Sequence, residues 1–439
     1  MPKPFELRKA LTTSSESGAA LLPYDLENFL NEELLELQPL AVLLDVIPAK
    51  SLMHEYTVRT SHPQGWFEGE TTPANPLNST YKRKFTQLKI QRIWGSVPGF
   101  QQALSEAFID ALEAELRGSL EGMSNVLEYG CMWGAADDLG FTGDAYQYSG
   151  LFAHLAAYAE ENIISAGGAK ISLDALDEVV ATVTRFRGVD SDLKLWLMGL
   201  RMKQVLDGLQ TKVSIPLTNS VLADGKITMR NYADIPINPT AYTVPASVST
   251  SPADLAGTAA AGGTLGAGSY TYRISSVTVM GEQEASAATS AVVLADANKK
   301  VNLAWSKDPN AKLYYIWRQK ATAGWQLIDI VPALTYSADG TVNGAIETYV
   351  DDGTKTPRNI KPLEAGEQNI FLANRHKDRG VQFLGKMDDM GVPMDNLFSY
   401  VELARVKDTY DYMLKGYLGF RAKYPNTAGA ILRNVKLKA

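Results

Sequence analysis

One long amphipathic helix, predicted from Val97 to about Met123, constrains the fold of this chain more than any other feature. From Phe100 onwards, apolar residues recur at every third or fourth position, which places them on one face of a helix. Acidic residues such as Glu106 and Asp110 lie mostly off that face. At a rise of about 1.5 Å per residue the helix would be roughly 35–40 Å long, which is long for a globular domain.

An extended two-stranded excursion is predicted directly before this helix, between Glu55 and Gly95. The segment is rich in glycine, proline, threonine and aromatic residues, and it carries the basic run Lys82, Arg83 and Lys84. This composition favours strands that leave the body of the protein over strands that form a core.

The first 50 residues combine a polar lead with a short amphipathic helix at about 24–37. Its apolar face includes Leu26, Phe29, Leu30 and Leu34. A helix this short has little stability of its own in water. We therefore expect these four residues to pack against a partner or a neighbouring subunit.

The composition is that of a globular protein with two to three domains. The chain has 439 residues, of which 45% are hydrophobic and 21% charged, and no apolar run approaches the roughly 20 residues of a membrane span. The start has no secretory signal, and the single cysteine, Cys131, excludes an intrachain disulfide and suits a reducing cytoplasm. The net charge of −7 argues against a protein that coats DNA by bulk attraction.

Residues 172–209 predict a helix, a buried strand and a second helix. Ser172 is a suitable N-cap, and the helix ends at 185–188, where basic residues are followed by glycine. Residues 192–198 alternate like a strand, and 199–209 return to helical spacing.

The composition changes at about residue 238, and as far as 361 the chain is rich in Ala, Thr, Ser, Gly and Val. Short runs with strand-like alternation follow one another at 266–277, 291–294, 301–305, 313–318, 325–328 and 348–353. This spacing predicts a β-sandwich, and the runs resemble immunoglobulin-like and fibronectin type III-like modules. We expect a separable domain on the outer face that folds alone around Trp305, Tyr315, Trp317 and Tyr349. Beyond it, strands are predicted at 380–385 and 410–421, and a closing strand at 425–432.

The order of arm, extended loop and long helix resembles the major capsid proteins of tailed double-stranded DNA bacteriophages, which have the Hong Kong 97-type fold. The stretches 12–24, leading into Leu-Leu-Pro, and 46–51 carry the same likeness. The resemblance implies an α+β capsid fold into which an all-β immunoglobulin-like sandwich is inserted. Its predicted parts are an N-terminal arm (1–50), an extended loop (51–95), a peripheral domain with the spine helix (96–150), an axial domain (151–240), the insertion (241–362) and a return to the axial and peripheral domains (363–439).

The resemblance also implies a function. Such proteins assemble into pentamers and hexamers that close an icosahedral shell around double-stranded DNA, without sequence-specific binding and without a membrane. The implied location is the virion, after assembly in the host cytoplasm, and the implied partners include scaffolding, portal and decoration proteins.

Residues that carry enzyme chemistry are sparse. Four histidines and one cysteine show no metal-binding spacing, so we expect no catalytic residue, no metal and no cofactor. Glu68 and Glu70 stand two apart on a predicted strand, which puts them too close together for a glycosidase pair. We expect them to lie in a subunit interface, opposite Lys82, Arg83 and Lys84 of a neighbouring copy, because a loop of this kind lies over an adjacent subunit in the resembled family.

A different class of function stays open. The β-rich segment would also suit an extracellular carbohydrate-binding protein or a glycan-active enzyme with a fibronectin-like module. The absence of a signal peptide and of a catalytic set argues against it. Size-exclusion chromatography with negative-stain microscopy separates the two, since one forms shells or capsomers and the other monomers.

Overall fold

The computed structural model describes most of the chain between residues 40 and 437. The described residues are 40, 44, 46–49, 51–61, 63, 67, 78–105, 111–185, 194–212, 219–222, 227–245, 252–296, 299–337, 341–376, 379–386, 399–403 and 408–437. They form two compact units. The smaller contains residues 93–122 and 400–414, and the larger contains 36–92, 123–399 and 415–439.

In the smaller unit, helix and strand meet around one tyrosine. Tyr412, on β23 (Thr409–Ala422), lies against Gly95 of β4 (Lys89–Pro98), where any side chain larger than hydrogen would clash with the ring. The Tyr412 hydroxyl lies 2.9 Å from the Ser119 hydroxyl and donates to the Glu115 carbonyl at 3.1 Å. The tyrosine therefore anchors this strand to the helix.

The long helix is displaced from its predicted position. Strand β4 continues to Pro98, and the short α4 (Gly99–Ser105) precedes α5 (Ala111–Trp133), whose 23 residues extend about 35 Å. The predicted end near Met123 is wrong because the last turns of α5, from Leu127 to Trp133, are buried on all sides. Uniform burial removes the apolar periodicity that marks a helix in a sequence. No helix in the described part of the chain is long and apolar enough to span a membrane.

The predicted two-stranded excursion is an antiparallel pair. Strand β2 (Met53–Ser61) pairs with β3 (Thr80–Gln87), with Met53 opposite Gln87 at the base and Arg59 opposite Tyr81 near the tip. Most side chains of both strands are exposed or half-buried, so the pair has almost no core of its own.

A five-stranded sheet combines strands from residues 46–98 with strands from residues 381–422. Its strand order is β1 (Val46–Ala49), β21 (Val381–Lys386), β23 and β22 (Ser399–Glu402), with β4 also paired to β23. Strand β1 runs parallel to β21, with Val46 opposite Phe383.

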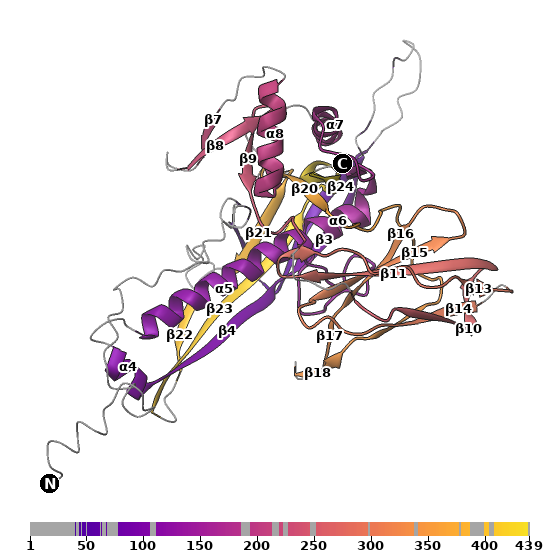
Figure 1. Ribbon diagram of the computed structural model, residues 1–439. Coiled ribbons are helices and arrows are strands. Elements are labelled where there is room, and N and C mark those ends of the chain that lie inside the picture. The colour runs from indigo at the N-terminus through magenta and orange to yellow at the C-terminus, as the bar shows by residue number, and fades with distance from the viewer. Residues whose placement is uncertain are drawn as a thin grey trace, which may run out of the picture. The chain divides into compact units, whose positions relative to one another are not determined.

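A seven-stranded sheet belongs to the larger unit (Figure 1). Ser172 caps α7 (Leu173–Thr184) by accepting the Ala175 amide at 3.2 Å, as predicted, and α8 (Leu200–Lys212) follows a fully buried strand. The predicted closing strand begins later than expected, because α9 (Pro425–Ala428) forms a helical turn first. The strand order is β5 (Ile163–Ser165), β24 (Gly429–Lys436), β20 (Glu367–Asn374), β6 (Lys194–Met198), β9 (Ile235–Pro239), β8 (Ile227–Tyr232) and β7 (Asn219–Leu222), with α6 (Leu151–Tyr158) and η1 (Glu160–Asn162) before β5.

The β-rich segment forms two main sheets and a small hairpin (Figure 1). The first sheet has the order β10 (Ala256–Leu265), β14 (Lys299–Ala304) and β19 (Thr348–Asp351). The second has the order β12 (Gly281–Glu282), β11 (Gly268–Thr278), β15 (Leu313–Lys320) and β16 (Gln326–Pro332), with β13 (Val292–Leu294) also on β11. Strands β17 (Leu334–Tyr336) and β18 (Val342–Ala345) form the hairpin.

The second sheet is buried on both faces. Tyr314 and Ile316 of β15 pack with Trp305 in a core that the two sheets share. The alternate residues Tyr315 and Trp317 belong instead to the main core of the larger unit. The expectation of a self-contained core around Trp305, Tyr315, Trp317 and Tyr349 is therefore wrong for Tyr315 and Trp317, whereas Trp305 and Tyr349 do lie in the local core.

A buried ion pair also ties the β-rich segment to the rest of the larger unit. Arg433 of β24 places Nη2 2.8 Å from Oε1 and 2.7 Å from Oε2 of Glu282 on β12, and both side chains are almost fully buried. The Arg433 guanidinium lies over the rings of Phe152 and Trp317, 5.1 and 5.6 Å from their centroids. These buried contacts indicate that β24 and the β-rich segment belong to one core.

Candidate subunit interface and aromatic pocket

The basic run of the hairpin divides into exposed and packed members. Lys82 and Arg83 on β3 are exposed, while the Lys84 ammonium lies 4.4 Å from the centre of the Tyr158 ring. Burial, and next the charge of Lys82, lower the pKa of Lys84 below its usual value. Lys82 and Arg83 are therefore the residues that remain available to a neighbouring copy.

The other predicted interface residues lie outside the described part of the chain. They are Leu26, Phe29, Leu30, Leu34, Glu68 and Glu70. The described residue Leu40, which follows the predicted helix at 24–37 within the arm, donates its amide to Glu128 Oε1 of α5 at 3.1 Å. Both residues are fully buried, so this point of the chain is fixed to the last turns of the helix.

Large apolar side chains are exposed on the hairpin and in the smaller unit. Phe67, beyond the end of β2, is 98% exposed, and Trp94 of β4 and Phe100 of α4 are 72% and 73% exposed. Scattered exposed apolar residues are ordinary in monomers, but aromatic rings exposed to this degree are typical of surfaces that meet another protein.

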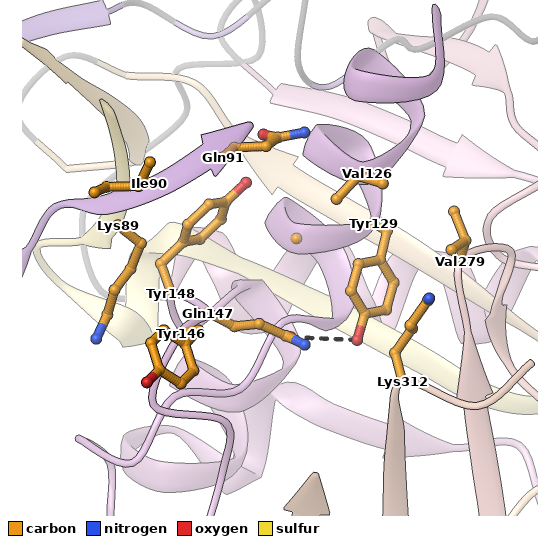
Figure 2. Close-up of a pocket in the computed structure, with 11 residues that line it drawn as sticks. Lys89, Ile90, Gln91, Val126, Tyr129, Tyr146, Gln147, Tyr148, Val279 and Lys312 are labelled. Carbon is orange, nitrogen blue, oxygen red and sulfur yellow. Dashed lines mark hydrogen bonds between the residues drawn. The ribbon is translucent and has the colours of Figure 1, made fainter. Parts of the chain in front are cut away.

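A pocket of about 230 Å³ opens at the base of the hairpin, within the larger unit (Figure 2). Val126 and Tyr129 of α5 form one wall, and the loop residues Tyr146, Gln147 and Tyr148 face them. Lys89, Ile90 and Gln91 of β4, together with Gly130, Val279 and Lys312, complete the lining.

Hydrogen bonds fix the pocket walls. The Tyr129 hydroxyl donates to Gln147 Oε1 at 3.3 Å, and the Tyr148 hydroxyl donates to the Leu127 carbonyl at 3.2 Å. The Lys89 ammonium donates to the Ala145 carbonyl at 2.5 Å. Burial raises the pKa of Tyr129 and of Tyr148, so both phenols stay neutral near physiological pH. The walls thus offer ring surfaces and amides but no activated nucleophile or base.

Among the described residues, His54, His154 and Cys131 form no reactive group, and His62 lies outside the described part of the chain. His154 is buried against Phe420 with no hydrogen-bond partner among the described residues for either ring nitrogen, and burial lowers its pKa to about 4. Cys131 is buried, and burial raises the pKa of its thiol. His54 Nε2 lies 2.8 Å from Arg421 Nη1, and burial and that charge lower its pKa. Among the described residues, no three His, Cys, Asp or Glu side chains are close enough to hold a metal ion.

The pocket was not predicted from the sequence. Lys89, Tyr129, Tyr146 and Lys312 come from segments far apart in the chain, and only the tertiary structure brings them together. The tyrosines at 146 and 148 were visible only as part of a stretch rich in Gly, Ala and Tyr.

Comparison with known proteins connects this architecture to a fold. No family model and no curated protein sequence matches the chain. The SrpI encapsulin complex of Synechococcus elongatus PCC 7942 is similar over 97% of this chain and 97% of its own, with a TM-score of 0.52 and 11% identity. The chain has the Hong Kong 97-type fold.

Two further structures are similar at lower scores. The capsid of cyanophage A-1(L) covers 95% of this chain and 98% of its own, with a TM-score of 0.48 and 11% identity. The capsid of a native GTA particle covers 97% and 99%, with a TM-score of 0.47 and 8% identity.

Proposed function

We propose that this chain is the major capsid protein of a tailed bacteriophage and that its copies assemble into pentamers and hexamers of an icosahedral shell around double-stranded DNA. One observation carries the proposal: a chain with the Hong Kong 97-type fold extends an antiparallel pair, β2 and β3, that has almost no core of its own. Such a pair is marginally stable alone and gains stability when another surface covers it. In this assignment α5 is the spine helix and the seven-stranded sheet is the axial domain.

The role is structural, not enzymatic. The pocket walls hold neutral tyrosines and a lysine bound to backbone, and His154 and Cys131 are buried away from partners that would activate them. The β-rich segment is proposed as the immunoglobulin-like insertion, because its two sheets share one apolar core. Scaffolding, portal and decoration proteins are proposed as further partners.

An encapsulin-type shell is the second candidate, favoured by the similarity to the SrpI encapsulin complex. The stretches 12–24 and 46–51 favour the phage capsid, because they resemble the corresponding stretches of phage capsid proteins. The two differ in what the shell encloses. Particles isolated from the native source and treated with nuclease should contain protected double-stranded DNA if the chain is a phage capsid.

Expression of the full chain tests whether it builds shells at all. Size-exclusion chromatography should give material in the void volume, and negative-stain microscopy should show closed particles of uniform diameter. A monomer at all concentrations would reject the proposal and favour the carbohydrate-binding alternative.

A further inference from the structure

The aromatic pocket has the size of a seat for one aromatic side chain. Its volume is about 230 Å³. Pockets that hold drug-sized ligands measure roughly 300–1,000 Å³, whereas a cavity of about 150 Å³ is enough for benzene. Tyr129 and Tyr148 are hydrogen-bonded to other residues through their hydroxyls, so ring surface remains as the main contact. The size and the walls suit an apolar ring.

The rim of the pocket is positively charged. Among the described residues, Lys89 and Lys312 line it and no aspartate or glutamate does, while Asp144 lies outside the lining, where its carboxylate interacts with Lys89 and accepts from Gln147 Nε2 at 3.0 Å. The Lys312 ammonium has no carboxylate within ion-pair distance among the described residues, and Lys89 is bound to the Ala145 carbonyl and Gln87 Oε1. An occupant that combines an aromatic ring with adjacent negative charge would complement this rim.

The chain itself carries such a segment. Residues 66–70 read Trp-Phe-Glu-Gly-Glu, and Phe67 is 98% exposed. The segment comes after the end of β2. Lys89, in contrast, comes two residues after Gln87, which lies at the base of the same hairpin. A side chain exposed to this degree does not fill the pocket of its own subunit. A second copy is therefore the natural source of the occupant.

We propose that the aromatic pocket binds residues 66–70 of a second copy, with Trp66 or Phe67 among the tyrosines and Glu68 and Glu70 facing Lys89 and Lys312. This inference rests on the proposed function, because only an assembly brings one hairpin onto the next subunit. Through this contact each subunit binds its neighbour. Glu68 and Glu70 then pair with the lysines of the pocket and not with the basic run on β3.

Disulfide trapping in assembled particles tests the contact. Cysteines are placed at Phe67 and at Tyr146, which is 49% exposed at the edge of the pocket. A disulfide requires Cβ atoms about 3.5–4.5 Å apart, so oxidation should join neighbouring chains only if the segment enters the pocket. Cys131 does not compete because it is buried. We expect F67C/Y146C particles to give a ladder of linked chains on non-reducing gels.

The matched control pairs Phe67→Cys with Val293→Cys. Val293 is 68% exposed on β13 and does not line the pocket. This pair and both single variants should remain monomeric on the gel. Particles that form with F67C/Y146C but give no ladder, or an equal ladder in the control, would overturn the inference and leave the proposed function standing. If the wild-type chain forms no particles, the proposed function itself fails.

A charge exchange covers the case in which the cysteine pair does not assemble. Glu70→Lys and Lys312→Glu should each lower particle yield several-fold, because each places like charges together. The double variant E70K/K312E should restore the yield to near that of the wild type. Single variants with unchanged yield, or a double variant no better than the singles, would contradict the inference.

Discussion

The Arg433–Glu282 pair is the most consequential single contact, because it joins the closing strand β24 to the β-rich segment inside the core. Both side chains are at most 2% exposed, and burial raises the pKa of Glu282 although Arg433 favours its charged form. Removing one member of such a pair leaves an uncompensated polar group in the interior.

We therefore expect Arg433→Met to lower the free energy of unfolding by about 3–5 kcal/mol, measured by urea denaturation of unassembled chains. The double variant R433M/E282M should recover most of this loss, since apolar groups of similar size replace both charges. A loss below about 1 kcal/mol in the single variant would show that the pair is not desolvated as the structure indicates.

His154 makes the free energy of unfolding depend on pH. Its pKa is about 4 in the folded chain, against an ordinary value of 6.5, because burial disfavours the charged ring. The unfolded chain therefore takes up the proton first as the pH falls, and stability declines between pH 6.5 and 4.

His154→Met removes this titration and puts an apolar side chain of similar length in the same place. The free energy of unfolding of the wild type should fall between pH 6.5 and 4.5 by about 1–3 kcal/mol more than that of the variant. The measurement is urea denaturation at several pH values. Parallel curves for the two proteins would mean that the pKa of His154 is not lowered in the folded chain.

At the scale of elements, β15 connects two cores. Its alternate side chains face the local core of the β-rich segment and the main core, where Trp317 lies with Trp133 and Phe152. A strand that fills the main core cannot be removed without leaving a large cavity there. The expectation of a separable domain that folds alone does not fit this packing.

We predict that replacing residues 246–361 by a Gly/Ser linker yields insoluble protein. The deletion removes Tyr315 and Trp317 from the main core and leaves Arg433 buried without Glu282. The measurement is the soluble fraction after expression, beside the intact chain. A soluble, folded deletion variant that assembles would contradict the shared core.

The exposed half of the basic run carries another prediction. Lys82→Glu with Arg83→Glu should reduce particle yield several-fold with little effect on unfolding of single chains. Each exposed ion pair contributes only about 0–1 kcal/mol, but the contact repeats at every subunit boundary. The matched control is Lys170→Glu with Lys307→Glu, two exposed lysines outside the hairpin, with the same change in net charge. Equal yields from the two double variants would show that Lys82 and Arg83 face solvent.

Local patterns predicted much of the fold, but they could not tell what each face of an element touches. Alternation placed β15 and β23 correctly, and the Ser172 cap marked the start of α7. The same alternation gave no sign that Tyr315 packs in the main core and Tyr314 in the local one. The pocket depends on Lys89, Tyr129 and Lys312 meeting in space, which no local pattern encodes.

For the whole molecule, assembly gives a physical reason for a long paired excursion with so little core. Strands β2 and β3 bury few of their side chains, and Phe67 beyond them is almost fully exposed. Such parts are a liability in a monomer, because exposed apolar surface and open strand edges promote non-specific association. In a shell, the same parts would be covered in every copy by the next subunit, so folding and assembly would be coupled.

Cryo-electron microscopy of particles purified after expression of the full chain is the decisive test of the proposed shell. We expect a closed icosahedral shell of pentamers and hexamers in which density for each β2–β3 hairpin continues onto the adjacent subunit. Uniform monomers, or a closed shell in which every hairpin folds back onto its own subunit, would contradict it.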